Sequence, residues 1–276
     1  MRTEENTKAL VEVRGLTKVY RAGHGVLHRR RETVAVNAAD LQVHAGTTFA
    51  LMGESGSGKS TLARCMAGLE KPTAGTVTFE GRGLMELSAE ELFGFRRKVQ
   101  LIFQESSTAM NPRFTAEEIV TEPLLIQGIG NAAERREIAA SLVERVGLSR
   151  EMLGRRVKQF SGGQRQRLAI ARALTLRPRL LILDEALAGL DLPVQAQVLR
   201  LLRGLRDEYE LTYLFVSHDL RLMAGIADEM AVMYRGAIVE RGATREVLSN
   251  PRHEHTKALI AATPHAEATQ TVEGRR

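Results

Sequence analysis

The nine residues GESGSGKST, at 53–61, constrain the fold of this 276-residue chain more than any other segment. They match the pattern G-x-x-x-x-G-K-[ST] and follow the apolar run TTFALMG, at 47–53, which predicts a buried strand. The next residues, STLARCMAGL, have the apolar spacing of a helix that stops at Gly68. A strand, a glycine-rich loop and a helix in this order indicate a phosphate-binding loop rather than a chance glycine-rich turn.

The residue types of this loop predict a site for a nucleotide with Mg²⁺. Glycines let backbone N–H groups approach phosphate oxygens, and the N-terminus of the following helix adds a favourable dipole. Lys59 would reach the β- and γ-phosphates, and Ser60 would ligate Mg²⁺. We therefore assign nucleotide binding to the whole loop, namely Gly53, Glu54, Ser55, Gly56, Ser57, Gly58, Lys59, Ser60 and Thr61.

The segment LLILDEALAGLD, at 180–191, carries two neighbouring acids at the end of an apolar run that predicts a buried strand. A nucleotide with Mg²⁺ needs a carboxylate at the C-terminal edge of the sheet, and Asp184 supplies one for the metal. Glu185 is one residue further on, so its side chain points differently and could face an attacking water as general base. Taken alone, the segment would suit a polar strand end beside a turn equally well, and the phosphate loop favours the chemical role.

A second helix start with anion-binding character begins at Phe160, in FSGGQRQRLAIARAL. Ser161 is a good N-cap, two glycines follow, and the predicted helix runs to about residue 176. One nucleotide cannot easily occupy two helix N-termini of the same chain. We therefore expect Ser161–Gln164 of one chain to face the phosphate loop of another chain.

The order of strand-like and helical segments predicts an α/β fold with a parallel sheet covered on both faces. Residues 105–160 differ in character, and Ile138, Leu142, Val143 and Val146 share one helical face. We expect one domain over 1–262, with an inserted helical subdomain at about 105–162. Residues 263–276 are expected to form a polar C-terminal tail.

Composition limits the classes of function. The net charge of +6 is compatible with nucleotide phosphate, nucleic acid or an anionic membrane surface, but aromatic residues make up only 4% of the chain. This scarcity argues against stacking on single-stranded nucleic acid. The single cysteine, Cys65, excludes an internal disulfide, and no apolar run approaches the ~20 residues of a membrane helix. With a polar rather than signal-like N-terminus, these features predict a cytosolic protein.

Taken together, the motifs resemble those of ATP-binding-cassette ATPases over residues 10 to about 260, and SGGQ is the most specific of them. The resemblance implies a P-loop NTPase core of the RecA type, with an antiparallel β subdomain and an inserted α-helical subdomain. It also implies ATP as the nucleotide and a head-to-tail dimer. In that dimer two ATP molecules lie between phosphate loops and the signature residues Ser161, Gly162, Gly163 and Gln164.

The resemblance assigns further residues one by one. Tyr20 stands where an aromatic ring stacks on adenine, and Gln104 where a residue senses Mg²⁺ and the attacking water. Asp191 lies in the loop that crosses the dimer interface, and His218 would contact the γ-phosphate. Two departures leave the rigidity of a loop and the geometry of the glutamate open. Ala186 replaces the usual proline, and the segment RRVKQF before the signature has none.

Two stretches, at 106–124 and 250–260, resemble the peptide and nickel importer family. The segments LLILDEALAGLDL and FVSHDLRL are most similar to the second ATPase subunit of nickel or metal-chelate systems, which also has alanine after the glutamate. We therefore expect an ATP-hydrolysing subunit of a bacterial nickel or metal-chelate importer. The alternatives are the same role in a di- or oligopeptide importer, or a soluble cassette ATPase without a transport role.

The implied partners are a second ATPase subunit, paralogue or self, two transmembrane permeases, and a periplasmic or lipid-anchored substrate-binding protein, without nucleic acid. The chain would work at the cytoplasmic face of the inner membrane, and residues 105–125 would receive a permease helix. His253 and His255 invite a nickel-binding interpretation, but their spacing in a polar segment favours a structural role. The cluster Arg29–Arg31 is expected to be a solvated loop.

Overall fold

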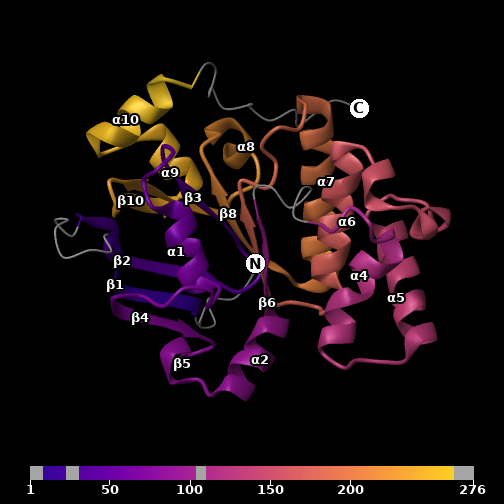
Figure 1. Cartoon of the computed structure of the whole chain (residues 1–276). Coiled ribbons are helices and arrows are strands. Elements are labelled where there is room, and N and C mark those ends of the chain that lie inside the picture. The colour runs from indigo at the N-terminus through magenta and orange to yellow at the C-terminus, as the bar shows by residue number, and fades with distance from the viewer. Residues whose placement is uncertain (1–8, 23–30, 104–109, 264–276) are drawn as a thin grey trace, which may run out of the picture.

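The computed structural model describes residues 9–22, 31–103 and 110–263. In these parts the chain forms a six-stranded sheet, a four-stranded sheet and the helices that cover them (Figure 1). Several predictions fall wholly or partly outside the described residues: those for Gln104, for the start of the segment 105–125, for Arg29 and its neighbour at 30, and for the tail from residue 264 onward.

The six-stranded sheet forms the centre of the molecule, with strand order β10-β9-β3-β8-β7-β6. Neighbouring strands are parallel except at the β9–β10 edge, where the two strands pair antiparallel as a hairpin. Phe49 and Leu51 enter one hydrophobic core, whereas Ala50 and Met52 enter the other, so the sheet is buried on both faces as expected. The strands are β3 Thr48–Met52, β6 Val99–Ile102, β7 Leu180–Asp184, β8 Thr212–Ser217, β9 Glu229–Tyr234 and β10 Ala237–Ala243.

The four-stranded antiparallel sheet has the order β2-β1-β4-β5 and packs on one face of the central sheet. Its first strand pairs with a long strand over 31–44 that the sequence analysis did not predict. Ala38 of this partner has a left-handed backbone with φ 45°, which interrupts the apolar alternation and explains the omission. The strands are β1 Ala9–Ala22, β2 Arg31–His44, β4 Ala74–Phe79 and β5 Arg82–Gly83.

Two helices lie on the side of this smaller sheet. Helix α1, Lys59–Met66, follows the glycine-rich loop and packs into the core shared by the two sheets. Helix α2, Ala89–Lys98, begins at a capping box, in which the Ser88 hydroxyl accepts from the Glu91 N–H and the Glu91 carboxylate accepts from the Ser88 N–H. Before α2, a short 3₁₀ helix spans Leu84–Glu86.

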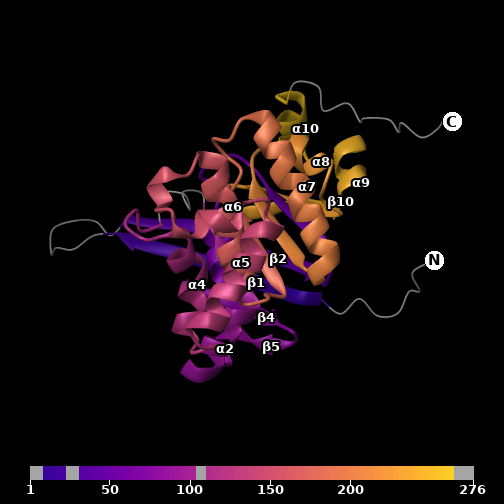
Figure 2. The same cartoon turned by 90° about the vertical axis from the view of Figure 1, so that its right-hand side faces the viewer.

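The opposite face of the central sheet is covered by α4, Ala116–Ile126, α5, Ala132–Arg145, and α6, Gly162–Leu174. Figure 2 shows these three helices packed together. Short 3₁₀ helices, Arg150–Gly154 and Val157–Gln159, connect α5 to α6. Leu142, Val143 and Val146 are buried as predicted. They belong to the same core as the strands, so the helical region has no separate core of its own.

The remaining helices are α7 Leu192–Tyr209, α8 Leu220–Ala224, α9 Thr244–Ser249 and α10 Glu254–Ala261, of which α8, α9 and α10 were not predicted. The two histidines near α10 have structural contacts: His253 Nδ1 caps the helix by accepting from the His255 N–H, and the His255 ring stacks on Tyr234 at 4.0 Å. No helix in the described ranges is long and apolar enough to cross a bilayer.

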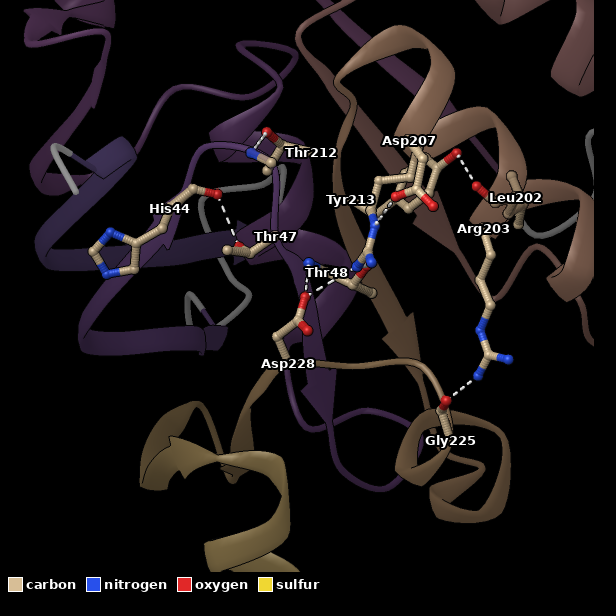
Figure 3. Close-up of polar contacts among 12 residues, drawn as sticks. His44, Thr47, Thr48, Leu202, Arg203, Asp207, Thr212, Tyr213, Gly225 and Asp228 are labelled. Atoms are coloured by element: carbon tan, nitrogen blue, oxygen red, sulfur yellow. Dashed lines mark hydrogen bonds and ion pairs between the residues drawn. The ribbon is translucent and has the colours of Figure 1, made fainter. Parts of the chain in front are cut away.

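A polar network joins the starts of the central strands to α7 (Figure 3). The Thr48 N–H donates to Asp228 Oδ2 at 2.8 Å, and Arg206 Nη1 donates to the same oxygen at 3.1 Å. The buried Tyr213 hydroxyl donates to the Leu202 carbonyl at 2.9 Å. These bonds satisfy polar groups at the end of β3 opposite the glycine-rich loop, and they hold that edge of the sheet in register.

Candidate nucleotide-binding site

The predicted phosphate loop, the two acids and His218 all follow the carboxyl ends of adjacent parallel strands. The register pairs Met52 of β3 with Ser217 of β8, and Asp184 of β7 with Val216 of β8. Each strand therefore releases its next residues at the same edge of the sheet, where ligands bind in open α/β folds. The structure thus brings together three segments that lie far apart in the sequence.

Two glycines of the loop are required because the backbone passes very close to neighbouring strands. A Cβ atom at Gly53 would lie 2.2 Å from the Met233 carbonyl oxygen, and one at Gly58 would lie 2.1 Å from the Ala35 carbonyl oxygen. Both glycines also have positive φ, 146° and 105°, which side chains rarely adopt. The loop is therefore seated on β2 and β9, and no other residue type fits at these two positions.

The first turn of α1 is open to an anion. Its N-cap, Gly58, makes no side-chain cap, whereas the N-caps of α2, α4, α5 and α6 are side chains that occupy the first backbone N–H groups. Uncapped N–H groups at a helix start favour a negatively charged ligand. The Ser57 hydroxyl beside them is buried and has no hydrogen-bond partner among the described residues.

Lys59 places a buried ammonium group in the same cradle. Its Nζ donates to the carbonyl oxygens of Gly53 and Glu54, both at 2.7 Å, and the side chain is almost fully buried. Burial lowers the pKa of this amine, and the nearby carboxylates of Glu185, Asp184 and Glu54 oppose that effect. A phosphate group would offer this cation stronger acceptors than the two backbone carbonyls do.

Ser60 and Asp184 form a pair of oxygen groups next to the cradle. The Ser60 hydroxyl donates to Asp184 Oδ1 at 2.8 Å, and Asp184 is 3% exposed. Burial raises the pKa of this carboxyl, and the bond from Ser60 partly offsets the increase. Such oxygen groups suit Mg²⁺, which commonly takes one or two protein ligands and completes its shell with phosphate oxygens and water.

Glu185 adopts a left-handed backbone with φ 47°, an unfavourable conformation for a residue with a side chain. Its N–H donates to the Val216 carbonyl at 2.9 Å, which holds the turn against β8. The carboxylate is 15% exposed, and its Oε1 lies 3.6 Å from His218 Nδ1. Glu185 and His218 therefore form a pair at the mouth of the site.

The loop after Glu185, which lacks the usual proline, is held by hydrogen bonds. The Ala188 N–H donates to the Glu185 carbonyl at 2.9 Å, and Gln195 Nε2 donates to the Leu187 carbonyl at 3.1 Å. Ala186 itself is buried. These hydrogen bonds restrict the backbone of the loop. The sequence alone did not determine its rigidity, because Ala186 replaces the usual proline.

The signature residues and Asp191 lie apart from the phosphate loop. Ser161 caps α6 as predicted, with the Gln164 N–H donating to its hydroxyl at 3.3 Å, and Asp191 caps α7 by accepting from the Val194 N–H at 2.9 Å. A Cβ atom at Gly163 would lie 2.8 Å from Val194, so the two helix starts pack closely. In the described part of the chain, no hydrogen bond or ion pair joins either helix start to residues 53–61.

Tyr20 lies near the end of β1, beside the segment that follows α1. Its hydroxyl donates to Glu70 Oε2 at 2.5 Å, and the residue is 39% exposed. Burial, followed by the bond to Glu70, raises the pKa of the phenol, which keeps it a donor at neutral pH. Sequence reasoning did not single out Glu70, because no local pattern links an acid at 70 to a tyrosine at 20.

The fold and this cluster define a P-loop nucleotide-binding protein. Residues 36–188 match the ABC transporter family. The chain is 43% identical over 261 residues to the dipeptide transport ATP-binding protein DppF of Haemophilus influenzae, covering 95% of this chain and 80% of that protein. It is 40% identical over 276 residues to the oligopeptide transport ATP-binding protein AppF of Bacillus subtilis, covering 99% and 84%.

A solved structure agrees with these sequence matches. A dimeric ATP-binding cassette in a post-hydrolysis state, bound to ADP and Pi, superposes with a TM-score of 0.75 at 30% identity, covering 85% of this chain and 99% of that chain. The chain therefore belongs to the ABC transporter family, among its ATP-binding subunits. The predicted fold class, a P-loop core with an antiparallel β subdomain, is confirmed.

The buried carboxyl of Asp184 leads to a prediction about stability. Because its pKa is raised in the folded chain, stability should fall as pH rises from the usual carboxyl range through that raised pKa. Near pH 7 the full free-energy cost of burying the charged carboxylate is present, so Asp184→Asn without nucleotide should melt at a higher temperature than the parent protein. Thermal unfolding at several pH values measures this difference, which should shrink in acid.

Asp207→Asn is the matched control, because the side chain of Asp207 is 78% exposed. Its melting temperature should stay close to that of the parent. A lower melting temperature for Asp184→Asn at neutral pH would show that the ionised carboxylate stabilises the fold, contrary to the prediction.

Proposed function

We propose that this chain is the ATP-hydrolysing subunit of a bacterial importer for di- or oligopeptides. The observation that carries the proposal is the meeting of the phosphate loop, Asp184 and Glu185 at one edge of the sheet. The relatives named for dipeptide and oligopeptide transport support the peptide alternative of the sequence analysis. None of these matches supports the nickel or metal-chelate assignment that the sequence analysis preferred.

The chemistry follows from the geometry of the chain's own residues. The open first turn of α1 and Lys59 would bind the phosphates, and Ser60 with Asp184 would hold Mg²⁺, which would neutralise phosphate charge. Glu185 accepts a proton from the attacking water, while His218 keeps the carboxylate oriented from 3.6 Å away. Gln104 would complete this set from outside the described residues.

The complete site needs two chains in this proposal. Ser161–Gln164 and Asp191 form hydrogen bonds only with their own helices in the described ranges, and no hydrogen bond or ion pair there joins either group to the phosphate loop. The dimeric cassette bound to ADP and Pi supports an arrangement in which these groups meet the nucleotide of a partner. That partner is a second copy or a paralogue.

A groove beside β6 is the proposed contact with a permease subunit. Phe103, Met110 and Phe114 line a cavity of about 320 Å³ between β6, α4 and α6, and the ion pair Arg172–Glu122 at 2.8 Å lies on its wall. Phe103 is 40% exposed. A groove lined by both apolar and polar side chains suits a short amphipathic helix. Binding to the transmembrane permeases, which work with a substrate-binding protein, would then hold this chain at the cytoplasmic face of the membrane.

Substitution of the proposed base should separate hydrolysis from binding. Glu185→Gln keeps the size of the side chain but removes its basicity, so the hydrolysis rate should fall by about 10²–10⁴-fold. Affinity for MgATP should persist, because Lys59, Ser60 and the loop backbone are unchanged, and the variant should collect as an ATP-bound dimer. Phosphate release and gel filtration with MgATP measure the two effects.

Glu144→Gln is the control, since this exposed glutamate of α5 makes no ion pair among the described residues. It should hydrolyse ATP at the parental rate. Near-parental hydrolysis by Glu185→Gln would instead make Glu185 a strand-end residue without a chemical role.

Helix α6, which begins at the signature residues, gives a prediction about the second chain. Ser161→Arg places a bulky cation at the start of α6, so it should block hydrolysis while the monomer still binds ATP with parental affinity. Ser149→Arg removes a comparable serine cap, at the 3₁₀ helix Arg150–Gly154, and should leave hydrolysis intact. Equal losses of ATP affinity and hydrolysis in the Ser161→Arg monomer would contradict the two-chain site.

The groove can be tested in the complete transporter reconstituted in vesicles. Alanine replacement of residues 111–113, Asn-Pro-Arg, should reduce peptide uptake strongly while basal ATP hydrolysis persists, because this turn borders the groove away from the phosphate loop. The chain carries the same tripeptide at 250–252, and its replacement is the matched control. Loss of ATP binding in the first variant, or uptake of nickel rather than peptide by the parent transporter, would contradict this proposal.

A further inference from the structure

We propose that Glu70 is a positioning residue for the nucleobase. Together with Lys18, it holds the ring of Tyr20 so that the base of the nucleotide stacks on the ring face opposite Lys18. The inference rests on the proposed binding of ATP and adds to it a determinant of base recognition that lies outside the phosphate loop.

Both carboxylate oxygens of Glu70 have partners, which are Tyr20, Lys18 and Arg64. One carboxylate oxygen, Oε2, accepts from the Tyr20 hydroxyl at 2.5 Å and lies 3.5 Å from Lys18 Nζ. The other oxygen, Oε1, lies 3.7 Å from Arg64 Nη1 on α1. Glu70 thus connects the phenol at the end of β1 to the helix that begins with Lys59 and Ser60.

The backbone around this cluster is also joined to β1. The Thr73 N–H donates to the Thr17 carbonyl at 2.7 Å, and the Val19 N–H donates to Thr73 Oγ1 at 3.0 Å. Lys18 Nζ donates to the Lys71 carbonyl at 2.9 Å. The strand that carries Tyr20 therefore has a fixed position relative to the C-terminal end of α1.

This arrangement leaves one face of the Tyr20 ring for a ligand. Lys18 Nζ lies 5.1 Å from the ring centroid, within the range of a cation–π contact, and so covers one face. The residue is still 39% exposed. A hydrogen bond to a carboxylate is stronger than one between neutral groups, so it restricts the ring before the base arrives. A restricted ring loses less conformational entropy on binding, which increases affinity.

The effect should appear only for ligands with a base. Glu70→Ala should weaken MgATP binding about tenfold, the equivalent of losing one hydrogen bond to a charged group. Affinity for magnesium tripolyphosphate, which has the same triphosphate and no base, should not change. Glu70→Gln keeps a neutral acceptor and should fall between Glu70→Ala and the parent. Calorimetric titration measures both ligands on the full chain.

Glu80→Ala is the matched control for the loss of a carboxylate between two cations. Glu80 pairs with Lys98 at 2.6 Å and Arg179 at 3.4 Å, and in the described structure its carboxylate makes no hydrogen bond to an aromatic side chain. Its variant should bind ATP and tripolyphosphate like the parent. An equal loss of both ligands in Glu70→Ala would assign Glu70 a purely structural role and overturn the proposal.

Tyr20→Phe removes the hydrogen bond to Glu70 but leaves both ion pairs of Glu70 in place. It therefore distinguishes the effect of this hydrogen bond from a general effect on the fold. It should reduce ATP affinity as much as Glu70→Ala does, and adding Glu70→Ala to it should cause no further loss. Additive losses would mean that Glu70 acts by another route and would also overturn the proposal. Parent protein that binds tripolyphosphate but not ATP would refute base recognition, whereas binding of neither ligand would refute the proposed function itself.

Discussion

The close approach of the glycine-rich loop to its two neighbouring strands is the constraint on which the rest of the site depends. Gly53 lies against the Met233 carbonyl and Gly58 against the Ala35 carbonyl, at distances that exclude any side chain. The Gly236 N–H also donates to the Ser57 carbonyl at 2.9 Å. Because β9 belongs to the central sheet and β2 to the antiparallel sheet, the loop takes its shape only when both sheets are assembled.

The same edge of the sheet concentrates groups that are unfavourable for stability. Asp184 is a buried carboxylate, Lys59 is a buried ammonium group bound to backbone carbonyls, and Glu185 holds a left-handed backbone. Each is stabilised by a specific hydrogen bond. Asp184 accepts from the Ser60 hydroxyl, Lys59 donates to carbonyls of the loop, and the Glu185 N–H donates to the Val216 carbonyl. Unfavourable groups held in place by surrounding structure are typical of sites that bind a charged ligand.

The two ends of the strands differ in their contacts. Where β3 begins, Thr48, Arg206 and Asp228 satisfy one another, and the buried hydroxyl of Tyr213 has its acceptor. Where β3 ends, the Ser57 hydroxyl is buried without a partner in the described structure, and the first turn of α1 has no side-chain cap. One edge is therefore complete within the chain, and the other is left for a ligand and, in our proposal, a partner chain.

The sequence by itself determined which groups are candidates for the reaction and their order along the chain. The loop at 53–61, the acids after an apolar run and the serine cap at 161 are local patterns, since strand, turn and helix signals act over a few residues. Tertiary structure alone decided which distant residues support them: β2, hidden by the irregular Ala38, the carbonyls behind the loop, and Glu70 beside Tyr20. The most distant of these partners, Gly53 and Met233, are 180 positions apart in the chain, and no local pattern records such pairs because packing alone brings them together.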